Sequence, residues 1–386
     1  MGSQRLFIAS DVHLAHGGSD ATANALARLV TESRGAELVL AGDIFNLSLD
    51  PPSRDPIESV VSMLRPHAAL TSALSRHLRD GHRVTFIPGN HDAAIARPEL
   101  PRALEELLGV SGAPLSVANW FIRRGAVHLE HGHVYDPDNA PAHPLVPPTP
   151  GTEPLGVALT RRFLGPNKAY DFAHGSEFTP VAALRQAVRS FGPRMPLVLA
   201  RYFATSGSLC LRARHRRHRI GLHGERERGE AELDAEAERH ELDAELLNRL
   251  VENRPRPTHA SFRSMFFRLY FDRVIATTLV VSGTAGALVG GAPALGVGAL
   301  GALYLAGSVR KKQSRYGGLP IVRLREAARS VRELTGAELV VFGHTHVEDS
   351  EPGYVNSASF TYRSGHARPY LVIDERGTVE RRHLSD

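Results

Sequence analysis

Five stretches of this chain end in residues that commonly bind metal ions. Each follows a short apolar run, and apolar runs broken by glycine or polar residues predict buried strands. The five are Asp11-Val12-His13, Gly42-Asp43, Gly89-Asn90-His91-Asp92, His131-Gly132-His133 and Gly343-His344-Thr345-His346. Ligands on open α/β sheets bind beyond the carboxyl ends of the strands. We therefore expect these side chains to converge on one site.

The candidate ligands are carboxylates, imidazoles and one amide. Asp11 and His13 are two residues apart, so at the end of a strand both are expected to point to the same side. His344 and His346 have the same spacing. The whole set is Asp11, His13, Asp43, Asn90, His131, His344 and His346. These oxygen and nitrogen ligands suit Mn, Fe, Zn or Mg, and a thiolate site is not indicated.

This ligand set predicts phosphoester hydrolysis with two metal ions. Two divalent ions bring four positive charges, and ionised Asp11 and Asp43 remove two, which leaves about two for a phosphate oxygen and an attacking hydroxide. Asp43 is the expected bridge, because a carboxylate can give one oxygen to each ion and Gly42 leaves space around it. His91 stands beside Asn90, where it could protonate the leaving oxygen. Asp92 or a backbone carbonyl is expected to fix the tautomer of His91.

At these residues the chain resembles the calcineurin-like metallophosphoesterase superfamily. The pattern of that superfamily is DxH, GDxx(D/E/N), GNH(D/E), a single His and GHxH, and all five elements occur here in order. The resemblance implies a β-sandwich flanked by helices (αββα) and His91 as the catalytic histidine. It implies two divalent ions, with manganese expected first and iron, zinc or magnesium as alternatives. The first ion is expected on Asp11, His13, Asp43 and His346, and the second on Asp43, Asn90, His131 and His344.

Within the superfamily, the segments SDVHL and GDIFN are similar to the UDP-2,3-diacylglucosamine pyrophosphohydrolases of lipid A synthesis. That closer resemblance is partial. This chain has His91 and Asn46 where those enzymes typically have Arg and an acidic residue.

The order of predicted elements indicates an α/β fold with a large, mostly helical insertion. Strands and helices alternate in the first third of the chain, which predicts a sheet covered by helices. We expect core segments at 1–134 and 321–386, separated by an insertion at 135–320. The predicted strands are 5–10, 37–41, 83–88, 120–123, 126–130, 338–342, 353–356, 370–373 and 378–382, and the predicted helices are 20–33, 56–79, 101–108 and 321–335.

The insertion begins with a proline-rich loop and continues with a charged helix at 225–253. Because the loop leaves directly from the His131 motif, Asp136 and Asn139 are candidate substrate contacts, with a solvated loop as the alternative. His133, close to the ligand His131, is a further candidate substrate contact, with support of the metal ligands as the alternative. Leucines at 242, 246, 247 and 250 form one stripe on the charged helix. We expect this stripe to pack within the chain, and a partner site is the alternative.

Residues 274–309 contain no charged side chain. The turn Gly290-Gly291-Ala292-Pro293 divides them into two halves of 16 residues, each about 24 Å long as a helix and shorter than the ~30 Å hydrocarbon core of a bilayer. Ligand motifs precede and follow the run, so both of its ends must lie on one side of any membrane. Arginines and lysines flank it, as expected of a hairpin entering from the cytoplasm. The alternative is a helical pair buried against the domain or a second subunit.

Composition narrows the classes of function. The chain has 386 residues, 42% of them hydrophobic, a net charge of +5 and one cysteine, Cys210. A single cysteine excludes a disulfide framework. The favoured function is a membrane-associated hydrolase of phosphate esters or pyrophosphates in a small or lipid-linked substrate, at the cytoplasmic side of the inner or plasma membrane. A soluble, cytoplasmic nuclease or nucleotide phosphodiesterase is the alternative suggested by arginine clusters at 212–219 and 310–315, although a nucleic-acid partner is not favoured. A non-catalytic scaffold would have no need of the complete ligand set.

Overall fold

The computed structural model describes residues 5–169, 185, 188–290, 293–310, 319–361 and 367–385. The chain divides into two compact units. The first, here called the sheet unit, comprises Met1–Arg161, Ile220–Pro257 and Pro320–Asp386, and the second, the hairpin unit, comprises Arg162–Arg219 and Thr258–Leu319. All five ligand motifs lie in the sheet unit, as do residues 135–161 and 220–257 of the expected insertion.

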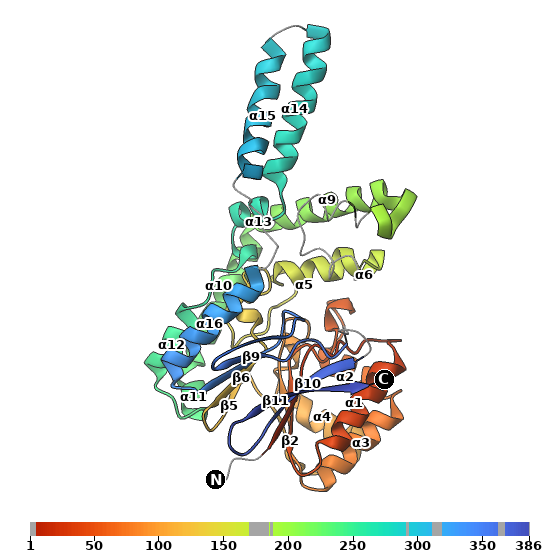
Figure 1. Cartoon of the computed structure of the whole chain (residues 1–386), viewed down its shortest axis with the longest axis vertical. Helices are drawn as coiled ribbons and strands as arrows, with labels where there is room; N and C mark the ends of the chain where they lie inside the picture. Colours follow the sequence, from red (N-terminus) through yellow and green to blue (C-terminus); the bar gives the residue numbers. More distant parts are fainter. Residues whose placement is uncertain are drawn as a thin grey trace. The chain divides into compact units, whose positions relative to one another are not determined.

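The sheet unit contains two β-sheets (Figure 1). The six-stranded sheet has the order β11-β10-β1-β2-β3-β4, in which β1 to β4 are parallel and β10 and β11 are antiparallel to their neighbours. Its strands are β1 (Leu6–Ala9), β2 (Glu37–Ala41), β3 (Val84–Ile87), β4 (Leu115–Val117), β10 (Ala367–Ile373) and β11 (Val379–Ser385). The helices of this half are α1 (Asp20–Glu32), α2 (Pro56–Leu64), α3 (Ala68–Arg79) and α4 (Glu99–Leu108), with short 3-10 turns at Leu47–Leu49 and Ala93–Ile95.

The five-stranded sheet has the order β5-β6-β7-β9-β8. Its strands are β5 (Phe121–Arg124), β6 (Val127–Glu130), β7 (Leu339–Phe342), β8 (Asp349–Glu351) and β9 (Tyr354–Asn356). Helices α11 (Leu233–Arg239), α12 (Ala244–Glu252) and α16 (Leu319–Thr335) pack against it, and α10 (Arg216–Ala231) precedes them. The 3-10 turn η3 (His133–Tyr135) and helix α5 (Leu155–Leu159) follow β6.

The alternation of side chains along each strand explains the layers. Leu6 and Ile8 of β1 lie in one apolar cluster with Leu129 of β6 and Val341 of β7. Phe7, on the opposite face of β1, belongs to a second cluster with residues of α1 to α4. Successive side chains of a strand point to opposite faces, so the two sheets pack face to face and helices cover their outer faces. The predicted αββα sandwich with a helical insertion is confirmed.

Two predicted helices are each divided in the structure. The helix expected at 56–79 is interrupted at Pro66, which lacks an N–H group and disfavours helical geometry in the preceding residue. The charged helix expected at 225–253 becomes parts of α10, α11 and α12. Leu247 and Leu250 of α12 are fully buried beneath the five-stranded sheet, which confirms that the leucine stripe packs within the chain.

The hairpin unit is helical in the residues that the structure describes. Its elements are the end of a π-helix (Thr160–Leu164) that begins in the sheet unit, α6 (Gly165–Asn167), η5 (Gly192–Arg194), α9 (Met195–Arg212), η6 (Thr258–Ala260), α13 (Phe262–Arg268), α14 (Phe271–Gly290) and α15 (Pro293–Arg310). Helices α14 and α15 lie side by side (Figure 1). They contain 20 and 18 residues, about 30 and 27 Å of helix, so they are longer than the predicted halves. Gly291, Ala292, Lys311, Lys312 and Arg315 lie outside the described residues.

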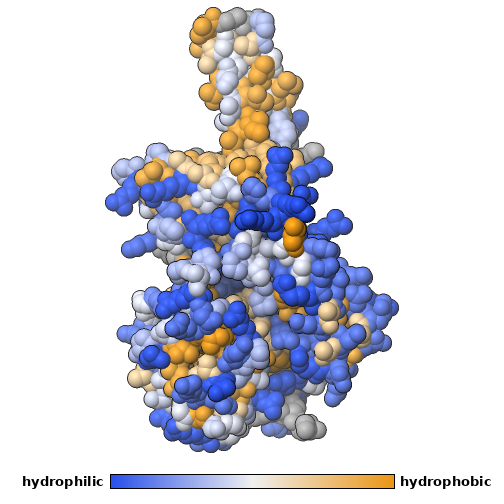
Figure 2. Space-filling model, turned by 180° about the vertical axis from the view of Figure 1, so that it is seen from behind, coloured by the Kyte–Doolittle hydropathy of each residue, from blue (hydrophilic) through white to orange (hydrophobic). Residues whose placement is uncertain are grey.

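Glycines meet at the contact between α14 and α15, beside Leu279 and Val280, and several large aliphatic residues face outward. A Cβ atom added to Gly283 would overlap the backbone of Gly298. Leu288 and Val289 are 85% and 93% exposed, and Figure 2 shows hydrophobic side chains over the surface of the pair. Among the described residues, Phe271–Val289 is the one helix long and apolar enough to cross a membrane, while the apolar part of α15, Pro293–Ser308, is shorter.

Candidate metal centre

The predicted ligands meet where strands of both sheets end. They follow β1 (Asp11 and His13), β2 (Asp43), β3 (Asn90), β6 (His131) and β7 (His344 and His346). Two groups of ligand atoms lie close enough to hold a metal ion: Asp11 with His13 and His346, and Asp11 with Asp43 and His131. The two groups share Asp11, whereas the resemblance implies Asp43 as the shared ligand.

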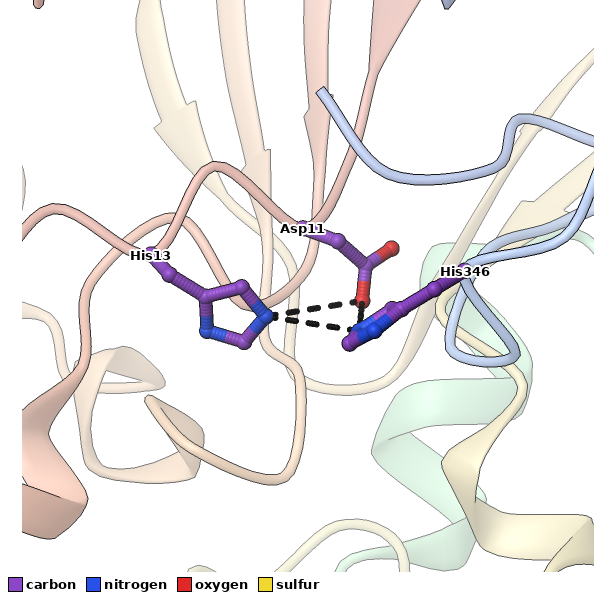
Figure 3. A group of neighbouring side chains, drawn as sticks. All are labelled: Asp11, His13 and His346. Atoms are coloured by element: carbon purple, nitrogen blue, oxygen red, sulfur yellow. Dashed lines mark hydrogen bonds and ion pairs between the residues drawn. The ribbon is translucent and has the colours of Figure 1, made fainter. Parts of the chain in front are cut away.

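The first group is compact (Figure 3). His346 Nε2 lies 2.9 Å from Asp11 Oδ1, and His13 Nε2 lies 4.0 Å from the same oxygen. The two imidazole nitrogens are 3.4 Å apart. The other oxygen of Asp11, Oδ2, accepts hydrogen bonds from the Ser10 hydroxyl and from the backbone N–H of His344. These bonds orient the carboxylate so that Oδ1 faces both histidines.

The second group joins the two sheets. His131 Nε2 lies 3.3 Å from Asp43 Oδ2 and 3.9 Å from Asp11 Oδ1. His131 Nδ1 donates to the carbonyl oxygen of Ala41 at 3.0 Å, which directs Nε2 toward the carboxylates. Asp43 Oδ1 accepts the backbone N–H of His91 at 2.7 Å.

Five of the ligands have a left-handed backbone. The φ angles are 54° at Asp11, 51° at His13, 52° at Asp43, 70° at His344 and 59° at His346. The paired ligands therefore do not converge by the two-residue alternation of a strand, as the sequence had suggested, but because each turns away from the strand end. A left-handed residue costs roughly 1–2 kcal/mol when it carries a side chain, although Asp and Asn tolerate the conformation best. The fold maintains this unfavourable geometry at the site.

Two glycines permit the close approach of the ligands. A Cβ atom on Gly89 would overlap the carboxylate of Asp43, and one on Gly42, whose φ is +90°, would overlap the ring of His131. Gly42 was expected to leave space for Asp43. The structure shows that it accommodates His131, and that Gly89 accommodates Asp43.

Charge within the cluster fits a bound cation. Burial raises the pKa of Asp11, but His131 and His346 outweigh it and hold that pKa well below its ordinary value. Burial lowers the pKa of His131, but Asp43 and Asp11 raise it more strongly, to about 10. The cluster thus favours positive charge at its centre. Asn90 Oδ1 is also buried and forms no hydrogen bond within the described residues, as expected of a ligand atom.

His91 is held by Ser48, a residue that the sequence analysis missed. Ser48 Oγ lies 2.7 Å from His91 Nδ1 and donates to Asn46 Oδ1 at 2.6 Å. Because the serine proton is engaged with Asn46, His91 must donate from Nδ1 to Ser48. The neutral tautomer of His91 therefore carries its proton on Nδ1. The available signal was the position of Ser48, two residues beyond Asn46 in the GDIFN motif.

The expected pairing of Asp92 with His91 is corrected. Asp92 is fully buried and accepts backbone N–H groups from Ile44 at 2.7 Å, Phe45 at 3.1 Å and Gly89 at 2.7 Å. It also accepts the N–H of Asp43 at 3.2 Å. The Asp92 side chain therefore connects the loops after β2 and β3, which carry the ligands Asp43 and Asn90. It does not orient His91, the expected general acid. Burial, followed by repulsion from Asp43, raises the pKa of Asp92 to about 7.

The expected substrate contacts lie beside the ligands. Asp136 Oδ2 is 3.1 Å from His344 Nε2, and Asn139 accepts a hydrogen bond from Asn90 at 3.3 Å. His133 is buried, and the centre of its ring is 5.4 Å from that of His131. Burial and the neighbouring histidines lower the pKa of His133 well below its ordinary value. At least Asp136 and Asn139 thus have protein partners in the site.

An αββα sandwich with carboxylate and imidazole clusters where its strands end is the arrangement of a metal-binding α/β protein. Residues 4–195 match the calcineurin-like phosphoesterase family, and the chain belongs to that family. It is a hydrolase that acts on phosphoester bonds and uses divalent metal ions. The search of curated proteins gave no match. The family match ends before β7, yet the structure places His344 and His346 in the same unit as Asp11.

Proposed function

We propose that the protein uses two divalent cations, manganese in the first place, to hydrolyse a phosphate ester or pyrophosphate of a lipid-linked molecule at a membrane surface. The observation that carries the catalytic part is the meeting of two ligand groups at Asp11, next to His91. The first cation would be held by Asp11, His13, Asp43 and His346, and the second by Asp43, Asn90, His131 and His344. The chemistry that such cations supply is Lewis-acid polarisation of the phosphate and activation of water.

His91 supplies the proton for the leaving oxygen. Its Nδ1 donates to Ser48, so Nε2 carries a proton only in the imidazolium form. Burial lowers the pKa of His91, and attraction to Asp43 partly opposes this shift. Donation from Nε2 therefore requires the imidazolium form, which attraction to Asp43 favours.

The hairpin of α14 and α15 supports attachment to a bilayer. A helical pair that folds in water turns most of its large apolar residues away from solvent. This pair has Gly283 and Gly298 at its contact and leaves many of its large residues exposed. The outer surface carries large aliphatic residues, including Val281, Leu288, Val289, Leu295, Leu300 and Leu303, all at least 57% exposed. Small residues inside and aliphatic residues outside are typical of helices packed in lipid.

Aromatic and basic residues near the start of the hairpin support the same proposal. The guanidinium of Arg273 lies 4.6 Å from the ring centre of Tyr270, and that of Arg263 lies 6.0 Å from that of Phe267. Such residues are enriched at the boundary between lipid and water. Both ends of the hairpin unit continue into the sheet unit, so both remain on one side of the membrane. We propose the cytoplasmic side of the inner or plasma membrane.

The test is a substrate screen with the full-length protein and Mn²⁺, with and without vesicles. Phosphomonoesters, phosphodiesters, nucleotides and UDP-diacylglucosamine should be compared in detergent and in bilayers. We expect the highest kcat/KM on a lipid-linked pyrophosphate or phosphate presented in vesicles. Faster hydrolysis of soluble nucleotides or nucleic acid, with no binding to vesicles, would establish the nuclease or phosphodiesterase alternative.

A further inference from the structure

A chain of hydrogen bonds connects two candidate ligands that come from different sheets. His344 follows β7 in the five-stranded sheet, and Asn90 follows β3 in the six-stranded sheet. Between them lie Asp136 and Asn139, which follow η3. The distances are 3.1 Å from His344 Nε2 to Asp136 Oδ2, 2.7 Å from Asn139 Nδ2 to Asp136 Oδ2, and 3.3 Å from Asn90 Nδ2 to Asn139 Oδ1.

Asp136 determines which group donates and which accepts in each of these hydrogen bonds. An ionised carboxylate only accepts, so His344 Nε2 and Asn139 Nδ2 both donate to it. Asn139 then presents Oδ1 to Asn90, and Asn90 must donate from Nδ2. This arrangement leaves Oδ1 of Asn90 and Nδ1 of His344 as the atoms able to bind a cation. Asn90 Oδ1 is buried and has no hydrogen bond within the described residues.

Asp136 is itself held firmly. It is 5% exposed, and its second oxygen accepts the N–H of Asp138 at 3.1 Å. Its carbonyl oxygen accepts the N–H groups of Asn139 at 2.9 Å and Ala140 at 2.7 Å. A Cβ atom on Gly156 of α5 would overlap the Asn139 amide, so that helix packs closely against the chain of bonds.

We propose that Asp136 and Asn139 are positioning residues that orient His344 and Asn90 toward the second cation, an inference that rests on the proposed two-cation centre. Partners of this kind fix the tautomer and direction of metal-binding side chains. The sequence suggested that both residues contact substrate. Their hydrogen bonds assign them to the ligands instead.

The inference is tested by titrating the full-length protein with Mn²⁺ and measuring bound ions by calorimetry. Wild type should bind two ions. Asp136→Asn replaces the obligate acceptor with a group that also donates, so one ion should bind roughly 10- to 100-fold more weakly while the other is unchanged. Asn139→Ala should weaken the same ion. If circular dichroism shows that Asp136→Asn does not fold, the affinity of Asn139→Ala for this ion tests the positioning role alone.

Glu225→Gln is the matched control. Glu225 is buried and accepts hydrogen bonds from Thr149 and Thr152, which belong to the same segment after β6 as Asp136. In the described structure it contacts none of the candidate ligands. This variant should bind both ions as wild type does. If it loses one ion to the same extent as Asp136→Asn, or if Asp136→Asn and Asn139→Ala both bind two ions with wild-type affinity, the positioning role is wrong and the two-cation centre stands. If wild type binds one ion only, the centre and the positioning role are both overturned.

Discussion

Ser48 Oγ lies 2.7 Å from His91 Nδ1 and simultaneously donates to Asn46 Oδ1. The three side chains form a single directed series, in which an amide oxygen at one end determines which imidazole nitrogen faces the reaction. Neither Ser48 nor Asn46 contacts the ligand groups formed around Asp11 in the described structure. Their effect on catalysis can therefore be separated from metal binding.

Ser48→Ala should lower kcat with little change in metal content. The variant removes a hydrogen bond to a group that becomes charged, worth about 1.5–3 kcal/mol, or roughly a 10- to 100-fold loss of rate. Steady-state kinetics and metal analysis check this. Ser75→Ala is the control, because Ser75 is also buried but donates to the carbonyl oxygen of Leu108, which is not a candidate ligand. Equal losses in the two variants would mean that Ser48 acts only through stability.

His91→Asn should retain the metal ions and lower kcat by roughly 10² to 10⁴, the usual contribution of general acid catalysis. The loss should be smaller for p-nitrophenyl esters than for alkyl esters, since a good leaving group needs less protonation. Parallel kinetics on the two substrates provide the measurement. An equal loss on both would remove His91 from the acid role.

Asp11→Ala and Asp43→Ala distinguish the two candidate bridging residues. The structure places Asp11 in both ligand groups, whereas the family resemblance gives the bridging position to Asp43. Each variant should abolish turnover, and the variant that lacks the bridge should lose both ions, because it removes a ligand from each. Metal analysis after gel filtration measures the stoichiometry. Wild-type metal content together with activity in both variants would contradict the two-metal proposal.

Replacement of residues 274–309 by a short Gly-Ser linker should move the protein from the membrane fraction to the soluble fraction. No candidate ligand lies in the deleted span, so hydrolysis of a small soluble ester should survive. Hydrolysis of a bilayer-embedded substrate should fall much further. Fractionation and vesicle assays measure the two effects. A wild-type protein that is soluble and monodisperse without detergent would instead assign α14 and α15 to a subunit contact.

The sequence predicted the parts of this structure that depend on local pattern. The apolar run predicted a strand at 5–10, and the structure has β1 at Leu6–Ala9. The ligand motifs were recognisable because each ends an apolar run. Strand β4, Leu115–Val117, was missed because three half-buried residues are too few to show a period.

The parts that were missed depend on tertiary contacts. No spacing in the sequence indicates that Ser48 would reach His91 from 43 positions away, or Asp136 would reach His344 from 208 positions away. The role of Asp92 was misjudged for a similar reason. Its proximity to His91 in sequence suggested a pair, but four backbone N–H groups on two loops compete for its carboxylate.

The discontinuity of the sheet unit has a consequence for biosynthesis. Strand β1 is flanked by β2 on one side and by β10 on the other, and β10 is synthesised after every other strand of this sheet except β11. Until then β1 presents an open edge of unpaired backbone groups, a template for aggregation. His344 and His346 also arrive late, after α14 and α15. In the membrane attachment proposed above, the hairpin would therefore reach the bilayer before the metal ligands can assemble, and the hydrolase would acquire activity only once it is already in place.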